Sequence, residues 1–409
     1  MAKEYKDLVV GLDIGTAKVM VVVAEVLPDG ELKLAGLGVA PSNGLKRGVV
    51  VNIDATVQSI QQALKEAELM ADCKITRVYT GITGSHIRGI NSTGMVAVKD
   101  REVTEADVAR VVETAKAINI STDQRLLLVE AQEFVIDGQE VKQPIGMSGI
   151  RLEAKVHIVT GAQSAAENII KCVRRCGLDV DRLMLNPLAS SMSVLTADER
   201  ELGVALVDIG AGTTDVAIFT NGAIRHTAVI PIAGDLITSD IAMALRTPTK
   251  DAEEIKIESG YAKQLLADPD VQVEVPGLGD RTPRMLSRQA LAGVIEPRVE
   301  EIFSLVQQVI RDSGYEEVLS SGIVLTGGSA VMPGMVELGE DIFLKPVRRG
   351  LPKYAGGLAD MVSQPRAATV MGLLEEARLA RLRGYKVTQK KSSVNNAFGR
   401  FKDFIVGNF

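Results

Sequence analysis

Two short segments of the sequence place a carboxylate, glycines and hydroxyl groups in the same order. The first is Asp13-Ile-Gly-Thr-Ala-Lys18, and the second is Asp208-Ile-Gly-Ala-Gly-Thr-Thr-Asp215. Glycine permits a sharp turn and a close approach of the backbone, so that successive amide groups can point at one anion. An aspartate at a strand end can hold Mg²⁺ through water, because Mg²⁺ keeps several waters and few carboxylates. The pattern predicts two turns that grip phosphate groups.

A third glycine segment, Gly327-Gly328-Ser329, follows an apolar strand and suits the α-phosphate and base of a nucleotide. Each segment alone also fits a plain strand and turn, and the prediction depends on the three occurring together in this order. The residues expected to bind nucleotide are Gly15, Thr16, Ala17, Lys18, Gly210, Gly212, Thr213, Thr214, Gly234, Gly327, Gly328 and Ser329, and the expected Mg²⁺ ligands, through water, are Asp13 and Asp208.

Two other phosphate-binding motifs are excluded. The sequence has no Gly-x₄-Gly-Lys-Ser/Thr segment and therefore no P-loop. Gly36-Leu-Gly38-Val-Ala-Pro41 has proline where the dinucleotide fingerprint needs its last glycine.

Strands and helices must position these turns. Apolar runs at 8–13 and 19–24 flank the first turn, and runs at 204–208 and 216–220 flank the second. The two Asp-Ile-Gly units lie 195 residues apart, close to half of the chain, which indicates an internal duplication of one architecture. Alternating strands and helices predict an α/β fold with sheets covered on both faces.

Two further elements are expected from the hydrophobic pattern. Residues 85–158 form a separate small α+β unit between the two halves. An amphipathic helix is expected to begin at Pro297, because proline suits the first turn of a helix.

Composition restricts the class of protein. The 409 residues are 46% hydrophobic and 24% charged, which excludes wholesale disorder. A net charge of −6, no Trp, six Tyr and eight Phe argue against a nucleic-acid partner. Three Cys are too few for a disulfide framework, and the charged N-terminus is not a signal peptide, so a reducing cytoplasm is expected.

The last part of the chain differs in character from the body. Eight Lys or Arg and one Asp fall in residues 378–409, so that the remaining residues carry a net charge of −13. Residues 383–395 are predicted to be a flexible linker, and 396–409 a short amphipathic helix of the kind that lies in a membrane interface. The alternative is docking on the protein's own core. The expected membrane-binding residues are Phe398, Arg400, Phe401, Lys402, Phe404, Ile405 and Phe409.

The three glycine segments resemble the phosphate-1, phosphate-2 and adenosine motifs of the actin, sugar-kinase and DnaK-type chaperone superfamily. Within it the sequence most resembles the FtsA family of bacterial cell-division actin homologues, especially at 198–203, 208–215, 238–242 and 322–328. The resemblance covers about residues 7–380. It implies an actin-like ATPase fold with two duplicated RNase H-like halves, an inserted small α+β subdomain and a C-terminal amphipathic helix.

The resemblance also implies a division of the chain. The first ATPase subdomain, 1A, takes residues 1–84, 159–203 and 360–382, and the inserted subdomain, 1C, takes 85–158. The second ATPase subdomain, 2A, takes 204–230 and 300–359, and subdomain 2B takes 231–299. The linker and the membrane-targeting helix follow.

The activity that the resemblance implies is ATP binding with Mg²⁺ and assembly into actin-like filaments. The implied partners are the tubulin-like ring protein FtsZ, through residues 231–299, later division proteins, through the inserted subdomain, and an anionic membrane, through the C-terminal helix. The implied location is the cytoplasmic side of the inner membrane at the division septum, as a peripheral protein.

Three more residues enter through the resemblance. Lys256 and Glu258 lie in a segment similar to the helix that contacts adenine and ribose in MreB-type actins, and a solvated helix face is the alternative. Asn186 precedes Pro187 where chaperones and MreB carry a glutamate that positions the attacking water. An amide can hydrogen-bond water but cannot act as a base, so at most a weak ATPase is expected.

Three other functions compete. A small-molecule kinase of the same fold would need a catalytic Asp or Arg at the interdomain cleft, and the sequence points to none. A chaperone-like ATPase would need a substrate-binding β domain after the ATPase, and none is expected here. A pilus-assembly actin homologue would share the inserted subdomain and lack the basic, Phe-rich tail.

The tail generates the first testable prediction. Burial of a large apolar side chain supplies roughly 1.5–3 kcal/mol, and ordering the backbone costs roughly 1–2 kcal/mol per residue, so one tail binds membrane weakly. A filament that presents many tails gains avidity. Replacing Phe401 and Phe404 with Glu should release the protein from anionic liposomes in a flotation assay and leave ATP binding intact. Flotation equal to wild type would rule out the tail as the anchor.

Overall fold

The computed structural model describes residues 7–279, 281–354 and 356–384. The predicted amphipathic helix at 396–409, with all its expected membrane-binding residues, and most of the linker at 383–395 lie outside the described residues. Within the described ranges, no helix combines the length and apolar character needed to cross a bilayer.

The first half of the molecule is built on a five-stranded sheet of order β11-β6-β1-β2-β3. β1, β2 and β3 form an antiparallel meander, and β6 and β11 extend it in parallel. The strands are β1 (Leu8–Ile14), β2 (Lys18–Val26), β3 (Leu32–Pro41), β6 (Arg77–Ile82) and β11 (Asp179–Leu185). The central strands β1 and β2 are buried on both faces, which explains their nearly continuous apolar sequences.

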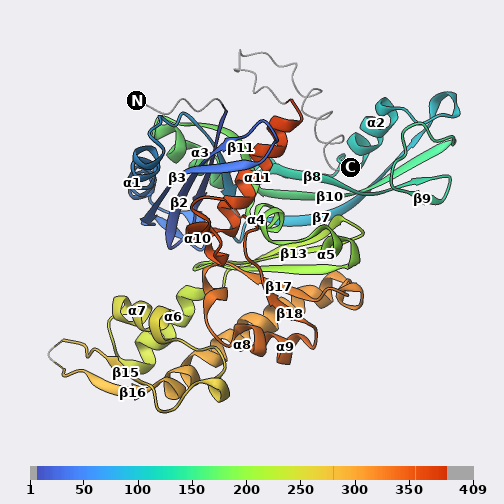
Figure 1. Cartoon of the computed structure of the whole chain (residues 1–409). Helices are drawn as coiled ribbons and strands as arrows, with labels where there is room; N and C mark the ends of the chain where they lie inside the picture. The colour runs from blue at the N-terminus through green and yellow to red at the C-terminus, as the bar shows by residue number, and fades with distance from the viewer. Residues whose placement is uncertain (1–6, 280, 355, 385–409) are drawn as a thin grey trace.

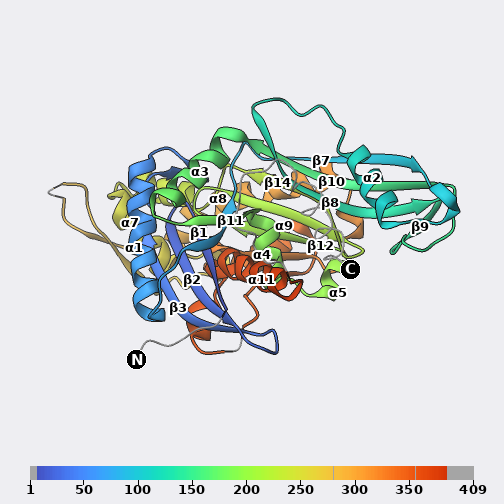
Figure 2. The same ribbon diagram turned by 90° about the horizontal axis from the view of Figure 1, so that it is seen from above.

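Helices cover both faces of this sheet (Figures 1 and 2). They are α1 (Ile53–Ala71), α3 (Gln163–Arg175), α4 (Asn186–Val194) and α11 (Ala368–Leu382). Glycines allow the closest approaches: a methyl group at Gly38 would overlap the backbone of α1, and one at Gly372 of α11 would overlap the backbone of α4 at Ala189. α11, the last helix that the structure describes, thus packs against the half in which the chain begins.

The second half repeats the first sheet. Its strand order is β14-β13-β12-β17-β18, with the same directions of pairing. Asp13 pairs with Met20 across the first hairpin, and Asp208 pairs with Asp215 across the second, so the register also repeats after 195 residues. The predicted duplication is confirmed. The strands are β12 (Val204–Ile209), β13 (Thr214–Thr220), β14 (Ala223–Ile230), β17 (Ile323–Thr326) and β18 (Val347–Arg349).

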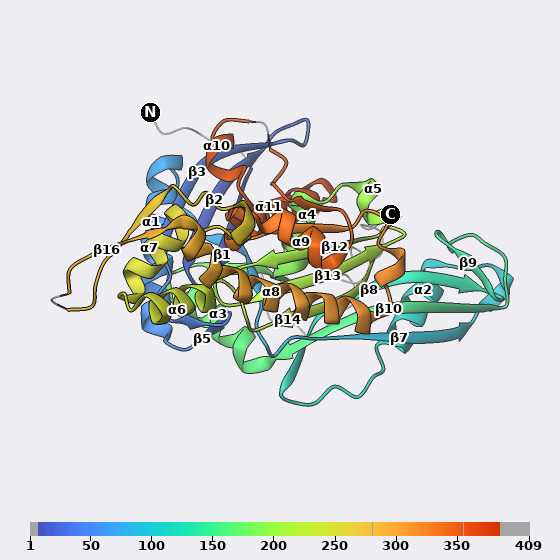
Figure 3. The ribbon, with the colours of Figure 1, turned by 90° about the horizontal axis from the view of Figure 1, so that it is seen from below.

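The remaining elements include the long α8, which runs beneath the second sheet (Figure 3). These elements are α5 (Ala197–Leu202), α6 (Gly234–Leu245), α7 (Thr249–Ser259), β15 (Gln272–Val275), β16 (Arg284–Ser287), α8 (Arg288–Ser313), α9 (Met335–Phe343) and α10 (Ala359–Val362). The prediction that a helix begins at Pro297 is wrong, because α8 begins nine residues earlier. The Ser287 side chain accepts a hydrogen bond from the Ala290 amide and caps the helix there.

The insert between the halves is a four-stranded antiparallel sheet of order β7-β10-β8-β9 with its own hydrophobic core. Its elements are β7 (Arg88–Ala97), α2 (Glu105–Ala115), β8 (Gln124–Ile136), β9 (Gln139–Val141) and β10 (Arg151–Ala162). α2 covers one face and lies so close to β7 that a methyl group at Gly94 would overlap the α2 backbone at Val111. Two very short strands, β4 (Leu45–Lys46) and β5 (Val49–Val50), form a separate hairpin.

The insert is covalently part of the first half but hydrogen-bonds to the second. Its strands β7, β8 and β10 contact β14, the edge strand of the second sheet. The Gln132 side-chain amide donates to the Ile224 carbonyl at 2.9 Å. The His157 ring bonds to Asn91 Oδ1 at 2.6 Å within the insert and to Thr227 Oγ1 of β14 at 2.9 Å. The insert therefore bridges the two halves.

His157 makes stability depend on pH. Burial lowers the pKa of His157 to about 4, from an ordinary value of 6.5. In the pH interval between these two values the unfolded chain binds a proton there and the folded protein does not, so the free energy of unfolding should fall as pH falls. At roughly 1.4 kcal/mol per pKa unit the loss is about 3 kcal/mol. Denaturant titrations at several pH values should show this slope.

The matched variant is His157→Gln, which keeps polar groups at the position and does not titrate. Its stability should change less than that of the wild type across the same interval. Identical pH profiles for the two proteins would contradict the assignment to His157.

Candidate functional site

The two predicted turns have the same backbone geometry. The Gly15 amide donates to the Lys18 carbonyl, and the Gly210 amide donates to the Thr213 carbonyl, both at 2.9 Å. Neither glycine has left-handed backbone angles. A Cβ at Gly15 or Gly210 would lie 3.0 or 3.2 Å from the carbonyl oxygen that its own amide contacts. Close packing within the turn, rather than unusual backbone angles, therefore favours glycine.

The turns lie opposite each other. A Cβ at Gly212 would approach Thr16 Oγ1 to 2.6 Å and Arg47 Cα to 2.9 Å. Thr16 Oγ1 accepts a hydrogen bond from the Gly48 amide at 3.1 Å, which fixes the loop that carries Arg47 between the two turns. Ala17, at the tip of the first turn, is exposed. The geometry thus brings the first and second glycine segments together.

Three buried carboxylates lie behind the turns. Asp208 accepts hydrogen bonds from Ser190 Oγ of α4 at 2.6 Å and from Thr369 Oγ1 of α11 at 3.4 Å. Burial and the neighbouring Asp13 raise the pKa of Asp208 to about 6. Asp13 itself lies 3.4 Å from Lys18 Nζ. These carboxyl groups are therefore close enough to influence one another.

Asp215 is the third carboxylate. It accepts hydrogen bonds from Thr83, at the end of β6, and from Thr213 Oγ1 at 3.1 Å. Burial, followed by the charge of Asp208, raises the pKa of Asp215 to about 7. Among residues 7–279, 281–354 and 356–384, no group of three or more His, Cys, Asp or Glu side chains is arranged to hold a metal ion directly. Mg²⁺ held through water at Asp13 and Asp208 stays a prediction.

The third glycine segment contacts the second turn. Gly327 has a φ of 88°, and a methyl group there would overlap the Asp208 carboxylate, so glycine is required. Ser329 Oγ donates to the Gly210 carbonyl at 2.9 Å, and the Gly234 amide at the start of α6 donates to the same oxygen at 3.1 Å. Gly328 is exposed, and no atom lies within 4 Å of the position its Cβ would occupy.

The two residues proposed on α7 occupy different environments. Lys256 Nζ contacts the Gly234 carbonyl at 3.2 Å and Thr238 Oγ1 at 2.8 Å, and it forms an ion pair with Glu253 at 2.6 Å. Glu258 is exposed. It lies two positions after Lys256, and residues two positions apart on a helix point in directions that differ by roughly 200°. The structure therefore brings Lys256, but not Glu258, to the glycine segments.

Thr214 does not join the site through its hydroxyl group, contrary to the prediction. Its Oγ1 donates to the Ile232 carbonyl at 2.8 Å. Thr214 is the first residue of β13, whereas Thr213 lies in the turn before it, and their hydroxyl groups bond to different partners. Thr213, which bonds to Asp215, is the one on the side of the carboxylates.

Asn186 begins α4 and is buried. Within the described part of the chain its Oδ1 has no hydrogen-bond partner, and a methyl group at Gly81 would overlap this oxygen. A buried polar atom without a partner costs roughly 1–3 kcal/mol. Such an atom is suited to bind a group that enters the site.

The sequence interpretation missed Thr83, Ser190, Thr369 and Arg47. The duplication contained a signal for one of them, Thr83. Leu12 pairs with Thr80 in the first sheet, and Val207, its equivalent, pairs with Leu325 in the second. The segment after β6 therefore corresponds to the glycine segment after β17, and Thr83 takes the place of Gly328. No comparable pattern marks Ser190 or Thr369, which come from helices far apart in sequence.

Two sheets of identical strand order, with glycine turns that face each other, define an actin-like protein. A solved PilM–PilN type IV pilus biogenesis complex has this fold, with a TM-score of 0.65, 18% identity, and coverage of 92% of this chain and 99% of that chain. MreB 5 of Spiroplasma citri bound to AMPPNP matches with a TM-score of 0.57, 14% identity, and coverage of 93% and 100%. At these identities the likeness concerns the fold.

Sequence comparison gives the family. The model of the cell division protein FtsA matches residues 205–372, and the model of the SHS2 domain inserted in FtsA matches 84–160. Cell division protein FtsA of Pseudomonas aeruginosa is 56% identical over 98% of both chains, and that of Escherichia coli K12 is 48% identical over 94% of both. This chain belongs to the FtsA family, and the resemblance seen in the sequence is confirmed.

The buried carboxylates generate a stability prediction. A carboxyl group with a raised pKa is protonated in the folded protein where the unfolded chain is ionised, so stability should fall as pH rises from about 4 to about 7. Asp215→Asn removes this contribution and should stabilise the nucleotide-free protein above pH 7 by about 1–4 kcal/mol, at roughly 1.4 kcal/mol per pKa unit. Denaturant titration of both proteins measures this difference in the free energy of unfolding.

Asp29→Asn is the control, because Asp29 is exposed and should change stability little. An Asp215→Asn protein that is less stable than the wild type at pH above 7 would contradict the predicted cost of the buried charge.

Proposed function

We propose that this chain is an actin-like cell-division protein that binds ATP with Mg²⁺ between its two halves, assembles into filaments and anchors FtsZ to the cytoplasmic membrane. The observation that carries the proposal is the pair of glycine turns held face to face, with no room for a side chain at Gly212. Membership of the FtsA family supports the role in cell division.

In this proposal the β- and γ-phosphates lie between the turns. Amides of Thr16 and Ala17 face them from one side, and the Gly212 amide, with the Thr213 hydroxyl, faces them from the other. Gly15 and Gly210, whose own amides close the turns, allow the phosphates a close approach to the backbone. Asp13 and Asp208 hold Mg²⁺ through water, and the cation supplies positive charge to the phosphates. The AMPPNP-bound MreB 5 structure supports a nucleotide in a fold of this kind.

In this proposal the rest of the nucleotide lies along the third glycine segment. The open space beside Gly328 suits the α-phosphate and ribose, and the contact between Lys256 and Gly234 supports a place for the base near the α6–α7 pair. Glu258 is exposed and points in another direction, so no contact supports it as a ligand of the nucleotide. Lys18, beside Asp13, supplies a positive charge at the first turn.

Slow hydrolysis is part of the proposal. Asn186 is buried with an unpartnered carbonyl oxygen, which can accept a hydrogen bond from water but cannot take its proton. We expect turnover far below the roughly 10 s⁻¹ of a typical enzyme. Nucleotide would then bias assembly by its presence rather than drive it by rapid turnover.

The remaining interactions are also proposals. FtsZ binds the part at 231–299, later division proteins bind the insert, and the tail at 396–409 attaches the protein to the cytoplasmic side of the inner membrane at the septum. The subdomain limits expected from the sequence are retained, and the family match over 84–160 supports those of the insert. The kinase and pilus-assembly alternatives are not favoured, because relatives with about half of their residues identical are cell division proteins.

Gly328 offers the sharpest test of the nucleotide site. Gly328→Asp would put a carboxylate in open space that the proposal assigns to phosphate, so ATP affinity should fall at least about tenfold while the melting temperature is unchanged. Calorimetric titration with ATP and Mg²⁺ measures the affinity. Gly357→Asp is the matched control, since Gly357 is also exposed and also has no atom near its Cβ position.

Equal affinity of the Gly328→Asp variant and the wild type would refute this placement of the nucleotide. A loss of affinity in the Gly357→Asp variant as well would show that added negative charge acts without regard to position, and would refute it equally.

A further inference from the structure

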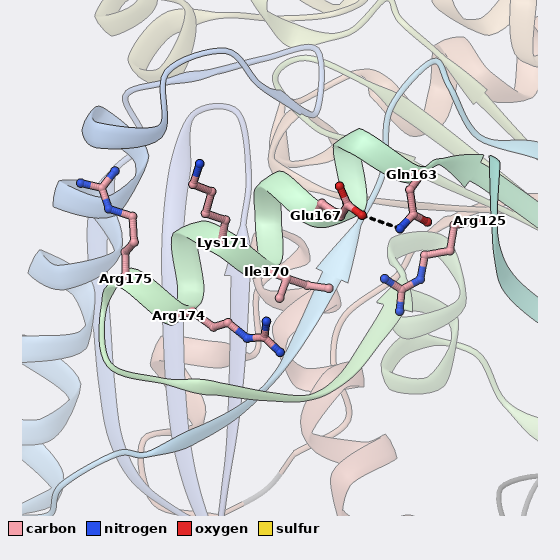
Figure 4. Close-up of a pocket in the computed structure, with 7 residues that line it drawn as sticks. All are labelled: Arg125, Gln163, Glu167, Ile170, Lys171, Arg174 and Arg175. Carbon is pink, nitrogen blue, oxygen red and sulfur yellow. Dashed lines mark hydrogen bonds between the residues drawn. The ribbon is translucent and has the colours of Figure 1, made fainter. Parts of the chain in front are cut away.

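A basic hollow lies on the surface of the first half, between α3 and the start of β8. Its volume is about 630 Å³. Four of the residues that line it are cationic and one is acidic. They are Arg125, Lys171, Arg174 and Arg175, with Glu167, Gln163 and Ile170 (Figure 4). The hollow contains none of the glycine segments.

Most of this positive charge is unpaired. Arg175 forms an ion pair with Asp54 at 2.6 Å, and Glu167 accepts a hydrogen bond from Gln163 at 2.6 Å. Across the described ranges, no carboxylate pairs with Arg125, Lys171 or Arg174. Cations gathered without partners repel one another, and a bound anion relieves that repulsion.

The geometry suits a phosphate group with an apolar neighbour. Arg125 and Arg174 reach from opposite sides toward the same space, and Ile170 lies between them (Figure 4). Lys171 points away from this space. The guanidinium group presents several donors in a plane and binds phosphate oxygens in pairs. Two such groups around an aliphatic side chain match the boundary between phospholipid headgroups and acyl chains.

The hollow continues toward the end of α11. Arg125, Ile170 and Arg174 also line a second cavity of about 1130 Å³, whose other residues include Leu379, Ala380 and Arg383. Figure 1 shows α3 and the last turn of α11 on the same upper side of the molecule, and Figure 2 looks onto both. The last residues that the structure describes therefore lie beside the basic surface.

We propose that this hollow binds the phosphate groups of anionic phospholipids, so that the α3 side of the molecule lies on the membrane. The inference rests on the membrane attachment in the proposed function. Residues 385–395, between α11 and the predicted amphipathic helix, reach at most about 40 Å when fully extended. A tail anchored in the bilayer keeps this surface nearby, which favours a lipid over an acidic protein as the ligand.

The test compares four full-length proteins by flotation. They are the wild type, the pocket variant Arg125→Gln with Arg174→Gln, the tail variant Phe401→Glu with Phe404→Glu, and a control variant, Lys250→Gln with Arg281→Gln. The control removes two exposed cations from the other end of the molecule. Each is mixed, with ATP and Mg²⁺, with vesicles of phosphatidylcholine alone or with added phosphatidylglycerol.

The pocket variant should bind the anionic vesicles at least about fivefold more weakly than the wild type, because each nearby cation contributes roughly a factor of five. Its melting temperature and ATP affinity should be unchanged, and the control variant should bind like the wild type. On neutral vesicles the pocket variant and the wild type should not differ. These results together would support the proposal.

Three outcomes would overturn it. If the pocket variant floats like the wild type, the hollow has no part in membrane binding. Retained binding of the tail variant tests a different statement: it would overturn the membrane anchor in the proposed function. Saturable binding of inorganic phosphate that is lost in the pocket variant without any change in flotation would identify a free anion as the ligand. Loss of poly-glutamate binding with normal flotation would identify an acidic protein.

Discussion

The close contact between the two glycine turns is the constraint on which the rest of the structure depends. Gly212 has no room for a side chain because Thr16 and Arg47 lie against it. Each turn continues without a break into two strands of its own sheet, and each sheet is covered by helices on both faces. A shift of one half against the other therefore changes the spacing of the turns directly, and a ligand between them favours one arrangement of the halves.

Keeping carboxylates in this place costs stability. Asp208 and Asp215 have raised pKa values because burial and the charges of neighbouring carboxylates disfavour their charged forms. The hydroxyl groups that bond to them come from α4, α11 and the end of β6, three elements distant in sequence. The residues that offset the cost are thus also the residues that fix both halves to the site, so the packing of α4 against α11 at Gly372 serves the site as well as the core.

The sequence was sufficient for the architecture, because a duplication places the same pattern in both halves. It was less informative about individual side chains. Thr213 and Thr214 look equivalent in the sequence, and the structure separates them because their hydroxyl groups have different partners. Pro297 looked like a helix start, but the cap at Ser287 and the apolar residues before the proline extend the helix upstream. Ser190 and Thr369 meet Asp208 only through tertiary packing, which no local pattern records.

The pairing of Arg88 with Thr160 places the two ends of the insert side by side. A module attached in this way can be exchanged between genes by recombination without lengthening or shortening any strand of its host sheet. The exchange is nevertheless restricted, since the insert also covers the edge strand β14 and satisfies its carbonyl groups through Gln132 and Asn91. A replacement module has to bring donors for the same carbonyls, or the second sheet is left with an edge open to pairing with other chains.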